Sequence, residues 1–135
     1  MPYQVGQSYE MKKEITECEV LMFAGLSGDL NPVHINEDYA QGTIFQRRIA
    51  HGALVNAYIS AVLGMHMPGL GTIYLSQESH YRKPACLGDV LTIRVEIKDI
   101  NEKGRAHIQT QAVNQNGELV VDGMAYVILP REQEA

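Results

Sequence analysis

The sequence has few of the residues that mark disulfide-rich or membrane-spanning proteins. Only two cysteines occur, Cys18 and Cys86, too few for a disulfide framework, and their spacing matches no metal motif. We expect both to be reduced thiols in a cytoplasmic protein. No apolar run reaches the roughly 18 residues of a membrane span, and no positively charged, apolar signal opens the chain. The sequence therefore predicts no association with a membrane.

Positive charge is also scarce. Eleven Lys and Arg stand against 16 Asp and Glu, which gives a net charge of -5, whereas a surface that binds nucleic acid is normally basic. We therefore expect no nucleic-acid partner. The composition is that of an ordinary globular protein. Its 135 residues contain no internal repeat or linker, which predicts a single domain over 1–135.

Apolar spacing divides the chain into a helical first half and a strand-rich second half. Thr16 and Glu19 form a capping-box pattern, in which each side chain is expected to bond the other residue's amide. The predicted helices span about 17–26, 36–40 and 52–63, and the last is apolar on nearly every face, so we expect it to be buried on all sides. The predicted strands are 71–82, 90–98, 105–113 and 119–129. These elements favour an α+β fold, with a curved antiparallel sheet wrapped around the apolar helix.

Two acid–base residues, Asp29 and His34, lie on one short segment with Asn31-Pro32 between them. The proline is expected to prevent a regular helix there. Five residues reach at most about 17 Å, so a bent loop can direct both side chains at one small volume. A carboxylate and an imidazole around one water are what proton transfer needs. Ordinary turn-forming or core roles for these residues stay open.

Gly52 opens the apolar helix, directly after His51. The first amides of a helix have no partner within it and lie at the positive end of its dipole, so they could hold a carbonyl oxygen that gains negative charge. A glycine would let such a carbonyl approach the backbone, although a helix-start glycine is also common by itself. We interpret His51 as shaping this approach, with a third catalytic group as the alternative.

The segments around these residues resemble the hydratase-2 motif of the MaoC-like family. The resemblance rests on Ser27–His34, Phe45, Arg48 and Ile49–Gly52, and it continues through Pro68-Gly69, Ile73–Leu75, Lys83-Pro84 and Gly88-Asp89. It implies a hot-dog fold and a homodimer in which two sheets join. It also implies a hydro-lyase that converts trans-2-enoyl-CoA reversibly into (R)-3-hydroxyacyl-CoA, without a cofactor.

The same resemblance assigns roles to residues. Asp29 and His34 would activate water, and the Gly52 amide would bind the thioester carbonyl. Asn31 would fix the turn, and Ser60 would help to hold the active-site carboxylate or water, unless its hydroxyl simply bonds back within the helix. A metal site formed by Asp29, His34 and His51 is disfavoured, because no further ligand has metal-site spacing and hydration needs no Lewis acid.

Two basic pairs, Arg47-Arg48 and Arg82-Lys83, are candidates for the phosphates of an acyl carrier, although such pairs are usually solvated. Three other activities stay open at this stage. They are dehydration of 3-hydroxyacyl groups on acyl-carrier protein, acyl-CoA hydrolysis by a hot-dog thioesterase, and acyl-CoA binding without catalysis. Neither the acyl chain length nor the pathway can be read from the sequence.

Overall fold

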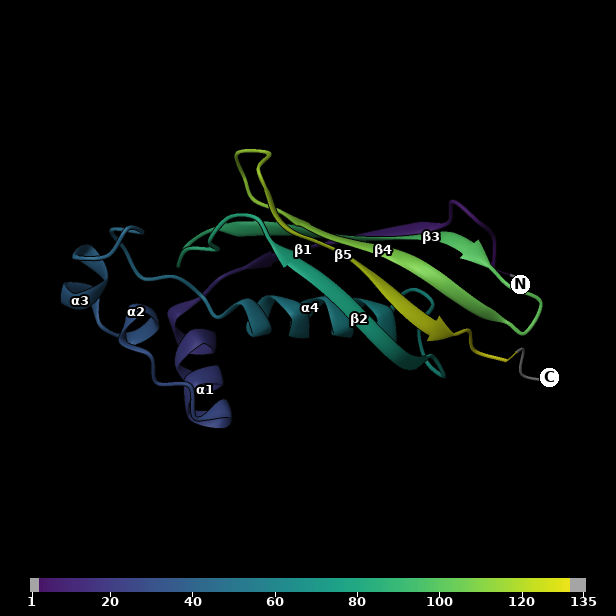
Figure 1. Cartoon of the computed structure of the whole chain (residues 1–135), viewed down its shortest axis with the longest axis horizontal. Helices are drawn as coiled ribbons and strands as arrows, with labels where there is room; N and C mark the ends of the chain where they lie inside the picture. The colour runs from purple at the N-terminus through teal and green to yellow at the C-terminus, as the bar shows by residue number, and fades with distance from the viewer. Residues whose placement is uncertain (1–2, 132–135) are drawn as a thin grey trace.

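The computed structural model describes residues 3–131. One strand comes first, four helices follow it in a row, and four more strands complete the described part of the chain (Figure 1). In chain order the elements are β1 (Ser8–Glu14), α1 (Glu17–Ser27), α2 (Pro32–Ile35), α3 (Glu37–Gln41), α4 (Gly52–Met65), β2 (Ile73–Tyr81), β3 (Val90–Ile100), β4 (Arg105–Val113) and β5 (Leu119–Ile128). Within these residues, no helix is both long and apolar enough to cross a membrane.

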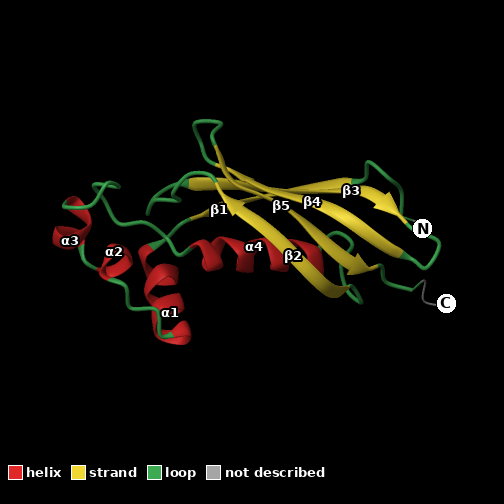
Figure 2. Cartoon of the chain, in the orientation of Figure 1, coloured by secondary structure: helices red, strands yellow, loops and turns green. Residues whose placement is uncertain are grey.

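The strands form one antiparallel sheet in the order β1-β3-β4-β5-β2, so β1 and β2 are its edges. Helix α4 lies along one face of this curved sheet, while α1, α2 and α3 extend beyond one end of it (Figure 2). This arrangement confirms the predicted α+β hot-dog fold. The residues before α1 contribute edge strand β1, which pairs with β3.

The core lies between α4 and the concave face of the sheet. Along β3 the inward residues Leu91, Ile93, Val95 and Ile97 are fully buried, as their alternation predicts. Val55, Ile59, Val62 and Leu63 of α4 are buried as well. Each such side chain stabilises the fold by about 1.5–3 kcal/mol relative to exposure, before conformational entropy is subtracted. The sheet therefore holds α4, and its first residue Gly52, in a fixed place.

One prediction about α4 is wrong: the helix is not buried on all sides. Ala53, Ala57, Ser60 and Ala61 are exposed. The physical reason is that a single sheet covers only one side of a helix, so the opposite side faces outward. That outward side carries small residues, most of them alanine. Because alanine is also apolar, the sequence pattern did not distinguish the outward side of the helix from its buried side.

Two local details also differ from expectation. The Thr16 hydroxyl accepts a hydrogen bond from the Glu19 amide, as predicted, but the Glu19 carboxylate accepts from the Thr16 hydroxyl instead of the Thr16 amide. Helix α2 begins at Pro32, where the sequence predicted no helix. Proline fits the first helical position because the amide there has no partner within the helix.

The packing of α4 predicts a contrast between two isoleucines. Replacing the fully buried Ile59 by alanine should lower the free energy of unfolding by about 2–5 kcal/mol, because it leaves a cavity. The same change at Ile44, which is 91% exposed, should stay within about 0.5 kcal/mol. Urea unfolding at equal protein concentration measures both, and equal losses would contradict the assigned core.

Candidate active site

The segment between α1 and α2 is shaped by short-range hydrogen bonds from its own side chains. Gly28 ends α1 in the left-handed conformation (φ 79°), which glycine adopts without strain. The Asp29 carboxylate then accepts a hydrogen bond from the Asn31 amide at 3.2 Å. The Asn31 side chain caps α2 by accepting from the Val33 amide at 3.3 Å. Asn31 therefore sets the direction in which α2 carries His34 back towards Asp29.

His34 is buried, and its ring is held in one tautomer. Its Nδ1 lies 2.7 Å from the Ile49 carbonyl oxygen. Because a carbonyl only accepts, Nδ1 carries the hydrogen and Nε2 keeps its lone pair. The backbone of His34 is also held, since Arg48 Nε donates to the His34 carbonyl at 2.8 Å.

The environment of His34 lowers its pKa below the ordinary value of 6.5. Burial is the largest cause because it disfavours the charged ring, and the neighbouring His51 acts in the same direction. The hydrogen bond to Ile49 and the charge of Asp29 oppose the shift. At neutral pH His34 is therefore an uncharged base with its Nε2 lone pair free.

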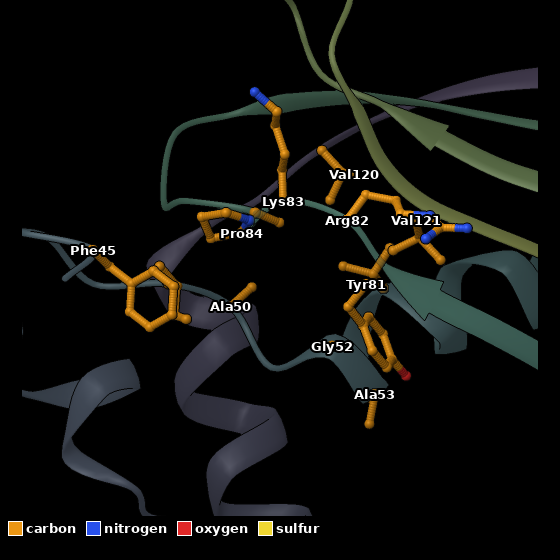
Figure 3. A pocket seen from close by; sticks show the side chains of 13 residues that line it. Phe45, Ala50, Gly52, Ala53, Tyr81, Arg82, Lys83, Pro84, Val120 and Val121 are labelled. Atoms are coloured by element: carbon orange, nitrogen blue, oxygen red, sulfur yellow. The ribbon is translucent and has the colours of Figure 1, made fainter. Parts of the chain in front are cut away.

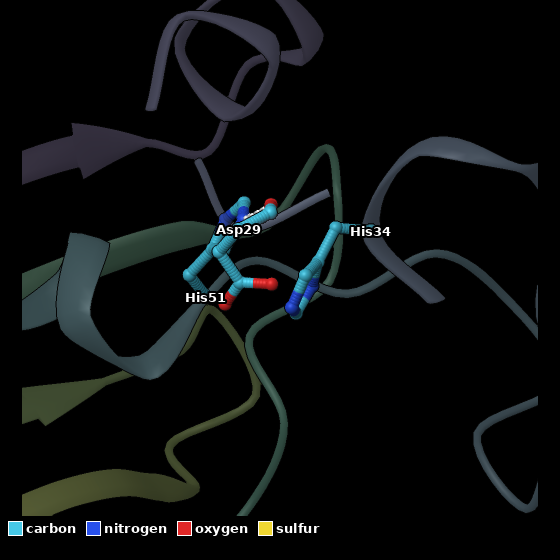
Figure 4. A group of neighbouring side chains, drawn as sticks. All are labelled: Asp29, His34 and His51. Atoms are coloured by element: carbon cyan, nitrogen blue, oxygen red, sulfur yellow. Dashed lines mark hydrogen bonds between the residues drawn. The ribbon is translucent and has the colours of Figure 1, made fainter. Parts of the chain in front are cut away.

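His51 contacts both predicted catalytic residues, Asp29 and His34. Its Nε2 donates to the Asp29 backbone carbonyl at 3.0 Å, and its ring stacks on that of His34 with centroids 3.8 Å apart. Its buried Nδ1 has no hydrogen-bond partner among the described residues. Asp29, His34 and His51 each place one polar side-chain atom within 4.8 Å of the others (Figure 4). Only Asp29 of the three is exposed.

This cluster is a poor cage for a metal ion, although its residue types are suitable ligands. The two imidazole planes are inclined by only 28° and lie face to face. Lone pairs of imidazole lie in the ring plane, so those of two stacked rings do not converge on one tetrahedral ion. One nitrogen of each ring is already used by a backbone carbonyl. The geometry suits a small hydrogen-bonded molecule between Asp29 and His34 better than a cation.

Gly52 begins α4 beside a cavity of about 420 Å³. Its amide has no acceptor among the described residues, as expected at a helix start. The cavity is lined by Phe45, Ile49–Ala50, Gly52–Ala53, Val55, Tyr81–Ala85 and Val120–Val121 (Figure 3). Asp29 and His34 do not line it. His34 is hydrogen-bonded to the Ile49 carbonyl, and the Asp29 carbonyl is hydrogen-bonded to His51. Residues 49–52 therefore connect the pair Asp29 and His34, called the dyad below, to the cavity.

Tyr81 explains why residue 52 is glycine. A Cβ atom at this position would lie 2.6 Å from Cε1 of the Tyr81 ring, which real side chains do not tolerate. The tyrosine packs against the first turn of α4 and forms a wall of the cavity (Figure 3). The sequence did not single out Tyr81, because only the strand register places it opposite Gly52.

The remaining predicted site residues lie in different surroundings. Arg48 bridges the His34 carbonyl and the Glu17 carboxylate, the latter at 2.7 Å, so it supports the site backbone. Lys83 pairs with Glu118, and Arg82 lies 3.8 Å from Asp122, and both line the cavity. Ser60 is exposed, about 12 Å along the α4 axis from Gly52. Its role beside the carboxylate stays a prediction.

Comparisons with known proteins identify similar chains and a similar fold. An (R)-specific enoyl-CoA hydratase from Rhodospirillum rubrum is 42% identical over 93% of this chain and 87% of its own length. A 3-hydroxybutyryl-CoA dehydratase from Methylorubrum extorquens is 41% identical over 98% of this chain and 84% of its own. The solved structure of the R-hydratase PhaJ1 from Pseudomonas aeruginosa superposes with a TM-score of 0.93 at 42% identity, covering 98% of this chain and 88% of that one.

The family described as "MaoC like domain" matches residues 2–118, which include the whole Asp29–His34–His51 cluster and Gly52. Taken with the relatives and the shared fold, this match shows that the chain belongs to the MaoC-like domain family.

Proposed function

We propose that this protein is an (R)-specific enoyl-CoA hydratase, a hydro-lyase that adds water to trans-2-enoyl-CoA, with Asp29 and His34 as its acid–base residues. The observation that carries the proposal is the paired arrangement of these two side chains. An exposed carboxylate lies beside a buried imidazole whose Nε2 is unprotonated and whose orientation is fixed by Ile49. Two acceptors at this spacing can hold both hydrogens of one water.

In the proposed reaction the substrate carbonyl binds at the Gly52 amide. Asp29 accepts one hydrogen of the water and orients it, and His34 Nε2 removes the other as the oxygen attacks C3. The electrons of the double bond move to the carbonyl oxygen, where the Gly52 amide and the α4 dipole stabilise the enolate. The imidazolium, stabilised by the Asp29 charge, then returns its proton to C2. No proton is gained or lost overall.

This single-base scheme has a stereochemical consequence. Because His34 both takes the proton and returns it, oxygen and hydrogen add to the same face of the double bond. The (R) configuration follows from the face that the substrate presents, and it agrees with the names of two hydratases that are similar to this chain. The relatives near 40% identity are named for CoA thioesters, which favours CoA over an acyl-carrier protein.

We further propose that one hot-dog domain, spanning 1–135, pairs with a second copy in a homodimer. Edge strand β2 exposes the apolar residues Ile73, Tyr74 and Leu75, which are 53%, 39% and 43% exposed, and an uncovered edge is a template for pairing. Ala57, one of the small residues on the outward side of α4, lines a cavity together with Tyr74 and Leu75 of this edge. We propose a cytoplasmic location, because Cys18 and Cys86 are both free thiols.

The dyad predicts specific losses of activity. Asp29→Asn and His34→Ala should each lower kcat/KM for crotonyl-CoA by about 10²–10⁴-fold, since each removes a proton-handling group. Asp38→Asn makes the same chemical change on α3, away from the cluster, and should leave the rate unchanged. The loss of absorbance at the enoyl thioester band measures hydration. Near-normal turnover by a folded dyad variant would remove that residue from the mechanism.

The lowered pKa of His34 predicts the acid limb of the pH profile. The unprotonated ring is the active form, so kcat/KM should be constant through neutral pH and fall as the pH drops through a midpoint below 6.5. Asp29 raises the pKa of His34, so Asp29→Asn should move the His34 midpoint, followed by NMR of its ring, further down. An upward shift in this variant would show that the two groups do not interact as proposed.

The homodimer is tested by placing a charge on the outward side of α4. Wild-type protein should sediment at twice the mass of one chain, and Ala61→Glu should shift it towards the monomer, because the carboxylate would be buried between two copies. Asn116→Glu adds the same charge at the exposed β4–β5 turn and should change nothing. A wild-type monomer at all concentrations would refute the pairing.

A further inference from the structure

The concave face of β2 carries polar side chains at positions where a sheet core is normally apolar. Gln77, Ser79 and Tyr81 pair with Ala125, Gly123 and Val121 of β5. Directly paired residues point to the same face of a sheet, and Ala125 and Val121 are part of the buried core. The three polar residues of β2 therefore lie on the face of the sheet that carries α4, where Tyr81 is still 55% exposed.

These side chains form one connected hydrogen-bond network that includes a residue of α4. Asn56 Nδ2 donates to the Tyr81 hydroxyl oxygen at 2.6 Å, and Asn56 Oδ1 accepts from the Ser79 hydroxyl at 2.9 Å. Gln77 Nε2 donates to the Ser79 hydroxyl oxygen at 3.1 Å and to the hydroxyl oxygen of the fully buried Thr110 at 2.9 Å. The network thus crosses from the helix to strands β2 and β4, one helical turn beyond Gly52.

The Tyr81–Asn56 hydrogen bond connects the walls of two cavities. Tyr81 lines the cavity beside Gly52, while Asn56 lines a second cavity of about 360 Å³ together with Ala57 and Tyr74–Gln77, on the side where the proposed homodimer would add its second copy. If the carbonyl lies at the Gly52 amide and the acyl chain follows α4 from the first cavity towards the second, the chain passes this hydrogen bond. Asn56 stands four residues, or about 6 Å of helix rise, further on, a distance comparable to the length of a four-carbon acyl group.

Passage of a longer acyl chain would be costly at this point. The acyl chain would either break the hydrogen bond between Tyr81 and Asn56 or pack against it and exclude water from the polar atoms of these two side chains. Burying an amide or hydroxyl without a partner is unfavourable. A methyl end that stops before Asn56 avoids this cost.

We propose that the Tyr81–Asn56 hydrogen bond, braced by Ser79, is a polar barrier that restricts this enzyme to short-chain enoyl-CoA substrates. The inference rests on the proposed hydratase function. It makes Tyr81 and Asn56 specificity-determining residues, separate from the dyad that performs the chemistry.

The barrier is tested by the ratio of kcat/KM for crotonyl-CoA to that for trans-2-octenoyl-CoA. The wild type should prefer the four-carbon substrate by at least about tenfold. Asn56→Ala removes the partner of both Tyr81 and Ser79 and should reduce this preference several-fold, mainly by raising kcat/KM for the longer substrate. Tyr81→Phe removes the hydroxyl but keeps the ring over Gly52, and should change the ratio in the same direction by less.

A matched control exists on the opposite face of the sheet. Tyr126 accepts a hydrogen bond from Asn101 at 3.2 Å, so Tyr126→Phe breaks a tyrosine–asparagine bond far from α4 and should leave the ratio unchanged. A wild type without chain-length preference, or a folded Asn56→Ala variant with an unaltered ratio, would overturn the barrier.

Binding separates this inference from the proposed function. Calorimetric titration with butanoyl-CoA and octanoyl-CoA, which cannot be hydrated, reports the barrier without catalysis. The wild type should bind the shorter thioester more tightly relative to the longer one than Asn56→Ala does. This result together with absent hydration would refute the hydratase and keep the barrier, whereas equal ratios in both proteins would refute the barrier even in an active hydratase.

Discussion

The hydrogen bond from His34 Nδ1 to the Ile49 carbonyl is the interaction on which the site depends. It decides the tautomer of the imidazole and so leaves Nε2 as the acceptor. It can do so only because the acceptor is itself immobile. Ala50, the next residue, donates its amide to the Ala85 carbonyl at 2.7 Å, and Ile49 forms a β-bridge with Cys86. The tautomer of one ring is thus tied to the backbone of the segment that connects β2 to β3.

Residues 48–52 connect helices α1 and α2 to α4 and the sheet. Arg48 holds α2 through the His34 carbonyl, His51 holds the α1–α2 turn through the Asp29 carbonyl, and Gly52 starts the buried helix. Five consecutive residues therefore make contacts in both parts of the chain. Burial beside this segment also lowers the pKa of His34, so the packing that assembles the site keeps the ring uncharged, as the proposed reaction requires.

Local sequence signals predicted the parts of this structure that depend on local physics. The alternation of Leu91 to Ile97 predicted a half-buried strand, and the Thr16–Glu19 pattern predicted the start of α1. The motif containing Asp29, His34 and Gly52 indicated residues that the fold does bring to one end of α4. Features that depend on register or on tertiary contacts were not predictable: the stacking of His51 on His34, the inward turn of Arg48, and Tyr81 over Gly52. The short helix α2 was not predictable from Pro32 alone, because proline both interrupts helices and is favoured as their first residue.

The proposed acid–base residues and the β2 residues of the proposed barrier come from separate stretches of chain. Asp29, His34 and His51 precede α4 in the chain, whereas Gln77, Ser79 and Tyr81 belong to edge strand β2, which follows α4. Substitutions in that strand can alter which molecules fit without disturbing how protons are handled. A scaffold divided in this way can diversify its substrates over evolutionary time while its reaction stays the same.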